Sequence, residues 1–242
     1  MHHRPLRRYR EAPCESSRSQ YKFFHGRANL MSSTQQDATY ATLRQWVTVG
    51  RFLPGERLKI RDVAASLGIG TMPVRAALLR LAAEGALTHS PNCGVAVPRL
   101  SRAEFDDVLQ NRLLLEGEAA ERGALRLSGE DKRDLRVLLR TMDEALTQSD
   151  AKTYLDANED FHVRLYRAAG SPLLMNLIET VWLKVGPLSN QLFDDHAALG
   201  VLNDAHTDVM RALDAGDAAA ARRAIERDLF VAGQFLRKCC AA

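Results

Sequence analysis

The spacing of apolar residues after position 36 predicts amphipathic helices. Tyr40, Leu43 and Val47 recur at helical intervals before Gly50, and a Pro-Gly turn follows at residues 54–55. Two more helices are expected over "RDVAASLG" and "PVRAALLRLAAEG", each closed by its final glycine. The stretch "ALTHSPNCGVAVPRL" then places a tight turn between two short strands. The predicted order is therefore helix, helix, helix, hairpin.

After residue 101 the pattern predicts helices alone. S-x-x-E at residues 101–104 and S-x-x-D at residues 128–131 each mark the start of an amphipathic segment. Because no strand pattern follows, this part is expected to be an all-α bundle. Further helices are expected at about 150–169, 172–185, 197–214 and 217–238.

These patterns divide the chain into three parts. Residues 1–35 are rich in Arg and Ser and show no steady period, so we expect a disordered basic extension, or extra residues ahead of a true start at Met31. Residues 36–100 are expected to form a winged helix-turn-helix of three helices and a β-hairpin wing. Residues 101–242 are expected to form the helical bundle. The predicted fold class is therefore mainly α.

Charge is distributed unevenly along the chain. Residues 1–30 hold 7 basic and 2 acidic side chains, and residues 36–100 hold 8 and 4. Residues 101–242 instead hold 18 basic and 24 acidic side chains. A basic part followed by an acidic part is typical of a nucleic-acid-binding domain joined to a sensing or assembly domain.

Composition also favours a cytoplasmic protein. No apolar run reaches the ~18 residues that a membrane-spanning helix needs, and no apolar segment near the N-terminus resembles a secretory signal. The cysteines show no CxxC spacing, which favours a reduced compartment over a disulfide scaffold. They are Cys14, Cys93, Cys239 and Cys240.

The helix-turn-helix pattern predicts where basic side chains meet DNA. The second helix of such a motif lays its first turn in the major groove, while flanking basic residues bind phosphates. Arg75 lies in that first turn, Arg61 lies on the preceding helix, and Arg80 lies further along. The alternative is that these arginines simply cover solvated helix faces.

The same segment resembles the GntR family of bacterial transcription regulators. The resemblance rests on "LPGERL", "RDVAASLGIGTMPVRAALLRLAAEGAL" and "PNCGVAVPRLS". It implies that Arg61 and Arg75 contact DNA and that Gly94 lies at the wing tip near the minor groove. The chain departs from the family pattern at Gly70, Thr71 and Ala76. At Thr71, a position on the DNA-contacting turn, the family often has Arg, which leaves the operator preference open.

Four polar residues of the helical part could converge on one centre. Asn158 and His162 are four residues apart and share a helix face. His206 and Asp228 lie at similar distances on either side of the "DAGD" turn, so antiparallel helices would bring them level. Together these residues offer nitrogen and oxygen ligands for a metal ion. The alternative is that His206 bonds Asp204 or Asp208 while His162 faces solvent.

The helical part resembles the FCD ligand-binding domain of the FadR subfamily of GntR regulators. The matching segments are "QNRLLLEGEAAERGA", "NEDFHVRLYRAAGSPLL" and "HTDVMRALDAGDAAAARRAIERDL". The resemblance implies a divalent metal site at Asn158, His162, His206 and Asp228. Asn158 replaces an expected Asp, and Asp228 replaces an expected His. This exchange shifts the expected ion from Zn²⁺ or Ni²⁺ toward Mn²⁺ or Mg²⁺, or weakens binding.

The resemblance also implies an effector and an assembly. FCD domains typically bind small carboxylates such as organic and sugar acids, and Arg112 matches an inward arginine that could hold one. The alternative is an i, i+4 ion pair of Arg112 with Glu116.

We therefore expect a homodimeric DNA-binding regulator, usually a repressor, that grips an inverted repeat and responds to such an acid. A regulator with a degenerate, metal-free pocket is the alternative. An enzyme is not expected, because no HExxH, nucleophile elbow or phosphate loop is present.

Overall fold

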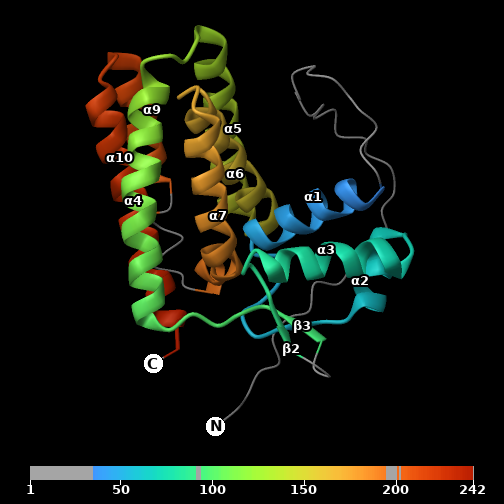
Figure 1. Ribbon diagram of the computed structural model, residues 1–242. Helices are drawn as coiled ribbons and strands as arrows, with labels where there is room; N and C mark the ends of the chain where they lie inside the picture. The colour runs from blue at the N-terminus through green and yellow to red at the C-terminus, as the bar shows by residue number, and fades with distance from the viewer. Residues whose placement is uncertain (1–34, 91–93, 195–200, 202, 242) are drawn as a thin grey trace. The chain divides into compact units, whose positions relative to one another are not determined.

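The computed structural model of the chain describes residues 35–90, 94–194, 201 and 203–241. It is mainly α-helical with one small sheet, as the sequence predicted, and the elements follow one another as Figure 1 shows. The extension expected at residues 1–35 lies outside the described residues, apart from Gln35, where the first helix begins. Among the described helices, none is long and apolar enough to cross a membrane.

The first half is the expected winged helix-turn-helix. Its helices are α1 (Gln35–Thr48), α2 (Ile60–Leu67) and α3 (Thr71–Ala83), and its wing strands are β2 (Thr88–Ser90) and β3 (Gly94–Ala96). The sequence pattern missed β1 (Arg57–Leu58), which pairs with β3 and gives the sheet order β1-β3-β2. Two residues are too short a run for alternation to reveal a strand.

The core of this half forms where the apolar positions of the helices meet. Leu43 and Val47 of α1 and Val74, Leu78 and Leu81 of α3 are completely buried. Between α2 and α3 the chain turns at Gly68, whose φ of 64° lies in the left-handed region that glycine adopts without strain. The turn positions the start of α3 at the surface.

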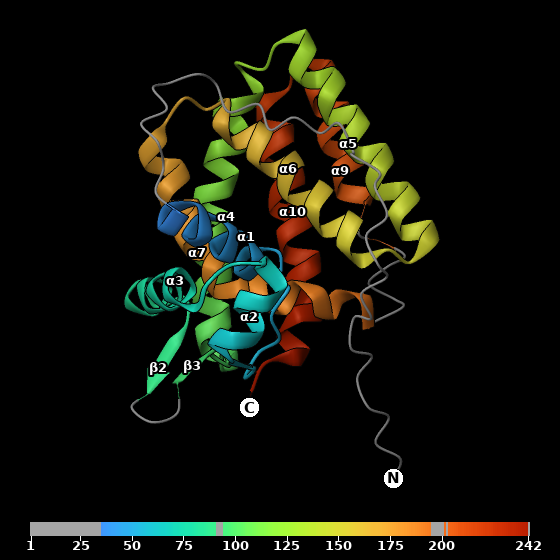
Figure 2. The same cartoon turned by 90° about the vertical axis from the view of Figure 1, so that its right-hand side faces the viewer.

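The second half is a helical bundle, seen from another side in Figure 2. Ser101 and Ser128 form the capping boxes that the sequence predicted, each with its side chain accepting a hydrogen bond from the backbone N–H three residues later. The helices are α4 (Arg102–Ala124), α5 (Gly129–Gln148), α6 (Ala151–Arg167), α7 (Pro172–Ser189), α9 (Asp204–Ala215) and α10 (Ala218–Leu236), with 3₁₀ turns η1 (Asn190–Asp194) and η2 (Arg237–Cys239).

Two helix boundaries differ from the prediction. The helix expected at about 172–185 is α7, and it continues through Gly186 and Pro187 to Ser189. The helix expected from residue 197 begins at Asp204, and residues 195–200 lie outside the described part. The continuation of α7 matters, because this last turn meets α1.

The C-terminal end of the bundle returns to its beginning. Ala241 forms a parallel bridge with Ser101, and its backbone N–H donates to the carbonyl of Leu100 at 2.9 Å. The N–H of Arg102 donates in turn to the carbonyl of Ala241 at 3.1 Å. The segment that enters α4 is therefore held by the last described residue.

Gly123 permits the close approach of α4 to α6, so we expect Gly123→Ala to destabilise the bundle. A Cβ at this position would overlap the carbonyl oxygen of Leu165, which is backbone and cannot swing away. Overpacking of this kind costs about 1–3 kcal/mol and outweighs the ~1 kcal/mol that alanine gains over glycine in a helix.

Urea unfolding would measure the change, with Gly117→Ala in the same helix as the control. A Cβ there would meet Glu226 Oε1 at 2.8 Å, the mobile end of a side chain. Equal stability of the two variants would contradict the expectation.

Candidate metal and effector site and DNA-binding surface

Two buried histidines and a half-buried aspartate, from three helices, converge in the bundle. His162 comes from α6, His206 from α9 and Asp228 from α10. The Nε2 atoms of the two histidines lie 3.2 Å apart, and Asp228 places Oδ2 3.4 Å from His162 Nε2 and Oδ1 3.7 Å from His206 Nδ1. Each residue can offer one ligand atom within 4.8 Å of the others. The structure thus brings together three of the four predicted ligands.

The described surroundings of His162 and Asp208 differ from the alternative expected for the histidines. His162 is only 3% exposed, so it does not face solvent. Asp208 instead pairs with Arg211 and, at 2.6 Å, with Arg227. Among the described ion pairs, Asp228 is the carboxylate that lies within 4 Å of both imidazoles.

A chain of hydrogen bonds that runs from Arg112 through Glu116 and Tyr166 fixes the orientation of the His162 ring. Its Nδ1 lies 2.9 Å from the hydroxyl of Tyr166, which donates to Glu116 Oε2 at 3.0 Å. Arg112 Nε donates to the other oxygen of Glu116 at 2.6 Å. Because the Tyr166 proton goes to Glu116, its oxygen accepts from His162 Nδ1–H. The Nε2 lone pair of His162 therefore faces His206 and Asp228, as a metal ligand requires.

Burial and neighbouring charges fix the protonation of Asp228 and Tyr166. Burial alone would raise the pKa of Asp228, but His206, His162 and Arg112 together hold that pKa below its ordinary value. Burial, with the charge of Glu116, holds the pKa of Tyr166 well above its ordinary value. Asp228 is thus an ionised acceptor and Tyr166 a neutral donor at neutral pH.

A small cavity opens beside His162. It has a volume of ≈ 60 Å³, and its polar lining includes Arg112, Asn158 and Glu159. Asn158 lies one turn before His162 on α6, so the fourth predicted ligand lines this cavity next to the cluster. Burial, reinforced by the charge of Asp160, raises the pKa of Glu159 to about 7.

Arg112 combines both arrangements that its sequence position suggested. It forms the i, i+4 ion pair with Glu116, at 2.6 Å, and it also lines the cavity. A guanidinium carries more N–H donors than the ion pair uses, so donors remain for a ligand.

Sequence reasoning does not identify Tyr166 as a site residue, and for Trp182 it favours core packing over a place in a pocket wall. Tyr166 lies four residues after His162, a helical spacing that could have suggested the contact. Trp182 lines the cavity, and its indole Nε1 is buried without a hydrogen-bond partner in the described part of the chain. Nothing in the local sequence separates such a tryptophan from one that only packs.

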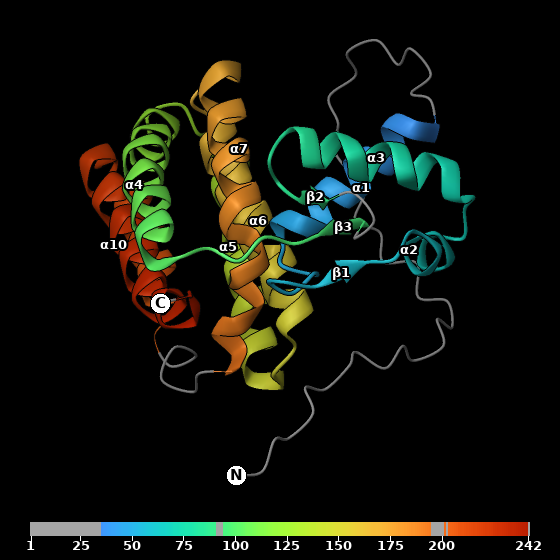
Figure 3. The ribbon, with the colours of Figure 1, turned by 60° about the horizontal axis from the view of Figure 1, so that its bottom comes forward.

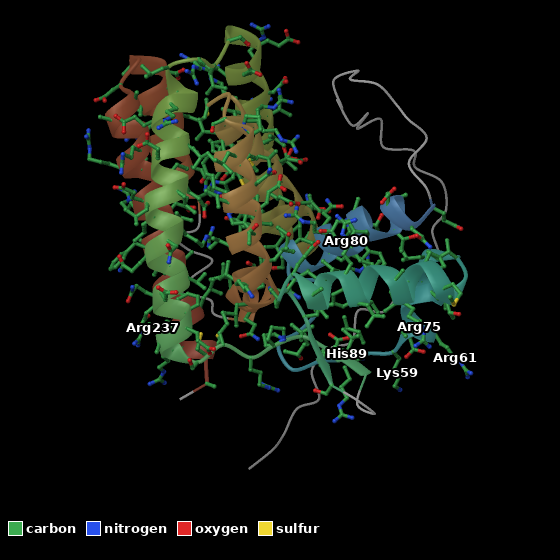
Figure 4. The ribbon with its side chains drawn as sticks, in the orientation of Figure 1. Lys59, Arg61, Arg75, Arg80, His89 and Arg237 are labelled. Carbon is green, nitrogen blue, oxygen red and sulfur yellow. The ribbon has the colours of Figure 1, made fainter. Side chains whose placement is uncertain are left out.

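Four polar side chains gather on one side of the winged half. Figure 4 shows Lys59, Arg61, Arg75 and His89 on the same side of α3, the side that carries the wing strands. All four are exposed, and the three basic residues take part in no ion pair within the described residues. Such a surface is suited to phosphates and base edges.

The other residues expected at DNA are placed differently. Thr71 is the first residue of α3, and Gly94, with a φ of 77°, is the first residue of β3. Arg80 lies on the side of α3 that faces α1 (Figure 4). There it stacks on the ring of Tyr40, at 3.6 Å, and binds Glu84 at 3.2 Å. Arg80 therefore links α3 to α1 through its contact with Tyr40.

Comparisons with known proteins agree with this architecture. Residues 35–97 match the model for "Bacterial regulatory proteins, gntR family", and residues 107–230 match the FCD domain. The regulator McbR of Escherichia coli is 30% identical over 152 residues, which are 63% of this chain and 69% of McbR. The repressor RspR of E. coli is 25% identical over 78% of this chain and 83% of RspR.

Solved structures agree as well. E. coli McbR/YncC matches with a TM-score of 0.78 and 25% identity, over 84% of this chain and 97% of that one. A GntR regulator from Rhodococcus sp. RHA1, 22% identical, shares the fold with a TM-score of 0.69 over 86% of this chain and all of that one.

Tyr166→Phe should destabilise the protein far more than Tyr40→Phe. Both changes remove a hydroxyl that donates to a glutamate, but the Tyr166–Glu116 bond is buried and the Tyr40–Glu84 bond is exposed. A buried charged group that loses its partner costs about 1–3 kcal/mol, whereas water replaces the exposed bond. Urea unfolding of both variants measures the difference, and equal losses would contradict the orienting role of Tyr166.

Proposed function

We propose that this chain, a DNA-binding transcriptional regulator that belongs to the gntR family and carries an FCD domain, binds a divalent metal ion and a compact carboxylate in its helical half. It is a regulator and not an enzyme, since the relatives found are named as transcriptional regulators. The observation that supports the metal most directly is the convergence of the buried His162 and His206 with the half-buried Asp228.

The donor set fits a divalent ion. Donors around an ion with bonds of about 2.0–2.1 Å lie roughly 3.3 Å apart in a tetrahedron, close to the 3.2 and 3.4 Å separations that Nε2 of His162 makes with His206 and Asp228. Two imidazole lone pairs at such a distance repel one another unless a proton or a cation lies between them. Asn158, beside His162, is the candidate fourth ligand.

Charge supports the same conclusion. The buried cluster contains one guanidinium, Arg112, and two carboxylates, Glu116 and Asp228. With neutral histidines it is short of one positive charge, and uncompensated buried charge is costly. A bound ion would supply that charge and attract the oxygen of an acid. Two nitrogen and two oxygen ligands suit Mn²⁺ or Mg²⁺ as well as Zn²⁺ or Ni²⁺.

The cavity beside the cluster supports a small effector. Its ≈ 60 Å³ corresponds to about four water molecules, which suits a compact acid better than a long acyl chain. Arg112 would bind the carboxylate of this acid. The indole Nε1 of Trp182, which has no hydrogen-bond partner among the described residues, would be a further donor at the cavity wall.

A second candidate is a metal-free pocket. The same contacts can form as hydrogen bonds when a proton is shared between His162 and His206 and Asp228 accepts from an imidazole. The FCD domain would then sense an acid through Arg112 alone. Metal analysis separates this candidate from the first.

On the DNA side we propose that a homodimer binds an inverted repeat. Arg75 on α3 would read base edges, with Met72, 71% exposed, beside it for apolar contact with thymine methyl groups. Arg61 and Lys59 would bind phosphates, with Thr71 and Gly94 against the backbone. Arg80, which was also predicted to contact DNA, would instead stabilise the packing of α3 on α1. Exposed Leu114 on α4, Leu125 just after α4 and Phe230 on α10 offer apolar surface for the partner. We also propose a repressor role, because the relative RspR is named a transcriptional repressor.

Metal content tests the first candidate. Purified protein, loaded with Mn²⁺ or Zn²⁺ and dialysed, should retain about one ion per chain, and excess ion should raise its Tm. The double variant His162→Ala/His206→Ala should retain none and show no rise, while His89→Ala on the wing strand should behave as the wild type. A wild-type protein that retained no ion would favour the metal-free pocket.

Arg75→Ala should abolish sequence preference, whereas Lys59→Ala should weaken all DNA binding alike. A base-reading arginine contributes about 1–3 kcal/mol of discrimination, while a phosphate contact adds mainly to the salt dependence. Titrations with a selected operator and with random DNA at two salt concentrations measure both effects. A uniform loss in both variants would show that Arg75 does not read bases.

A further inference from the structure

The cavity beside His162 has walls from both halves of the chain. The helical half contributes Arg112, His162 and the last turns of α7, while Thr48 and Val49, at the end of α1, come from the winged half. We propose that the winged half completes the effector site, so that the bound acid touches Thr48 and Val49 and displaces α1 from α7. This inference rests on the proposed function, because it concerns the same cavity.

Helices α1 and α7 touch at backbone distance beside this cavity. Gly186 faces the end of α1 so closely that a Cβ would lie 2.5 Å from the carbonyl oxygen of Val47 and would overlap that of Thr48. Gly50 approaches α7 in the same way, since a Cβ there would lie 2.6 Å from the carbonyl oxygen of Gly186. Cavity and contact thus share Gly186 and Thr48, so an occupant that needs room must press on this contact.

Each half also inserts an apolar side chain into the other. Leu183 of α7 is buried within the core of the winged half, together with Leu43 and Leu78. Val49 packs in return against the core of the helical bundle. Figure 3 shows α7 between the winged half and the pair α4 and α10. Helix α7 therefore belongs to both cores.

Two polar contacts extend the same junction. Arg44 of α1 binds Glu179 of α7 at 2.8 Å, and Lys184 Nζ donates to the carbonyl of Gly85, just after α3. Helix α1 in turn packs on α3 through Leu43 and Val47. A shift of α1 against α7 therefore moves α3, which carries Arg75.

This arrangement gives the effector different contacts in two states of the protein. With α1 seated on Gly186 the cavity is small, and with α1 displaced it admits a larger occupant. A ligand that prefers the open state shifts the population toward it, and DNA that prefers the seated state opposes the ligand by the same factor.

Gly186→Ala should reproduce the effect of the effector without any ligand. The added methyl group would clash with the end of α1, so we expect a ~10-fold lower operator affinity and no further change on adding malonate with MnCl₂. Metal retention should equal that of the wild type, because no ligand atom is changed. Gly117→Ala, on α4 and away from α1, is the matched control and should keep the wild-type affinity and response.

A second variant, Ser189→Leu, fills the cavity from α7 without the backbone clash and should lower operator affinity in the same way. Circular dichroism and thermal melts establish that each variant is folded, and Ser189→Leu decides the matter if Gly186→Ala does not fold. Wild-type affinity in the folded variants would overturn the proposal. If the wild type ignored malonate while both variants lost operator affinity, the coupling would stand and the proposed effector class would fail.

Discussion

The centre of the helical half is governed by the cost of burying charge. Arg112, Glu116 and Asp228 can lie inside the bundle only because each has a partner, and the partners come from different helices. The chain Arg112–Glu116–Tyr166–His162 links α4 to α6, and Asp228 and His206 add α10 and α9. This polar chain therefore fixes the relative register of four helices that apolar packing alone would leave freer to slide.

Much of the fold could be predicted from the sequence, because its determinants are local. The capping serines and closing glycines located the helices, and helix periodicity located their buried faces. The convergence of His206 and Asp228 also followed from local structure. Antiparallel helices joined by a short turn bring residues equally distant from that turn to the same level. The sequence pattern did not reveal the strand β1 or the full length of α7, since neither has a periodic signal of its own.

The parts of the site that were missed depend on contacts between distant segments. Nothing around Thr48 or Gly186 reveals that one faces the other, because the two residues lie 138 positions apart in the sequence. Likewise the position of Arg80 on α3 was correctly predicted, but whether it faced outward or toward α1 depended on where Tyr40 lies. Interhelical packing, rather than secondary structure, decides such cases.

The pairing of Ala241 with the segment around Ser101 has an architectural consequence. Because the backbone of Leu100 is hydrogen-bonded to that of Ala241, the helical half is entered and left at nearly the same point in space. A unit whose two ends adjoin is modular: it can be fused to another partner at that single point, with little disturbance of its own fold. The helical half of this chain is thus a module with two attachments to the winged half: the covalent linker before α4 and the packing of α7, whose Leu183 is buried in the winged core.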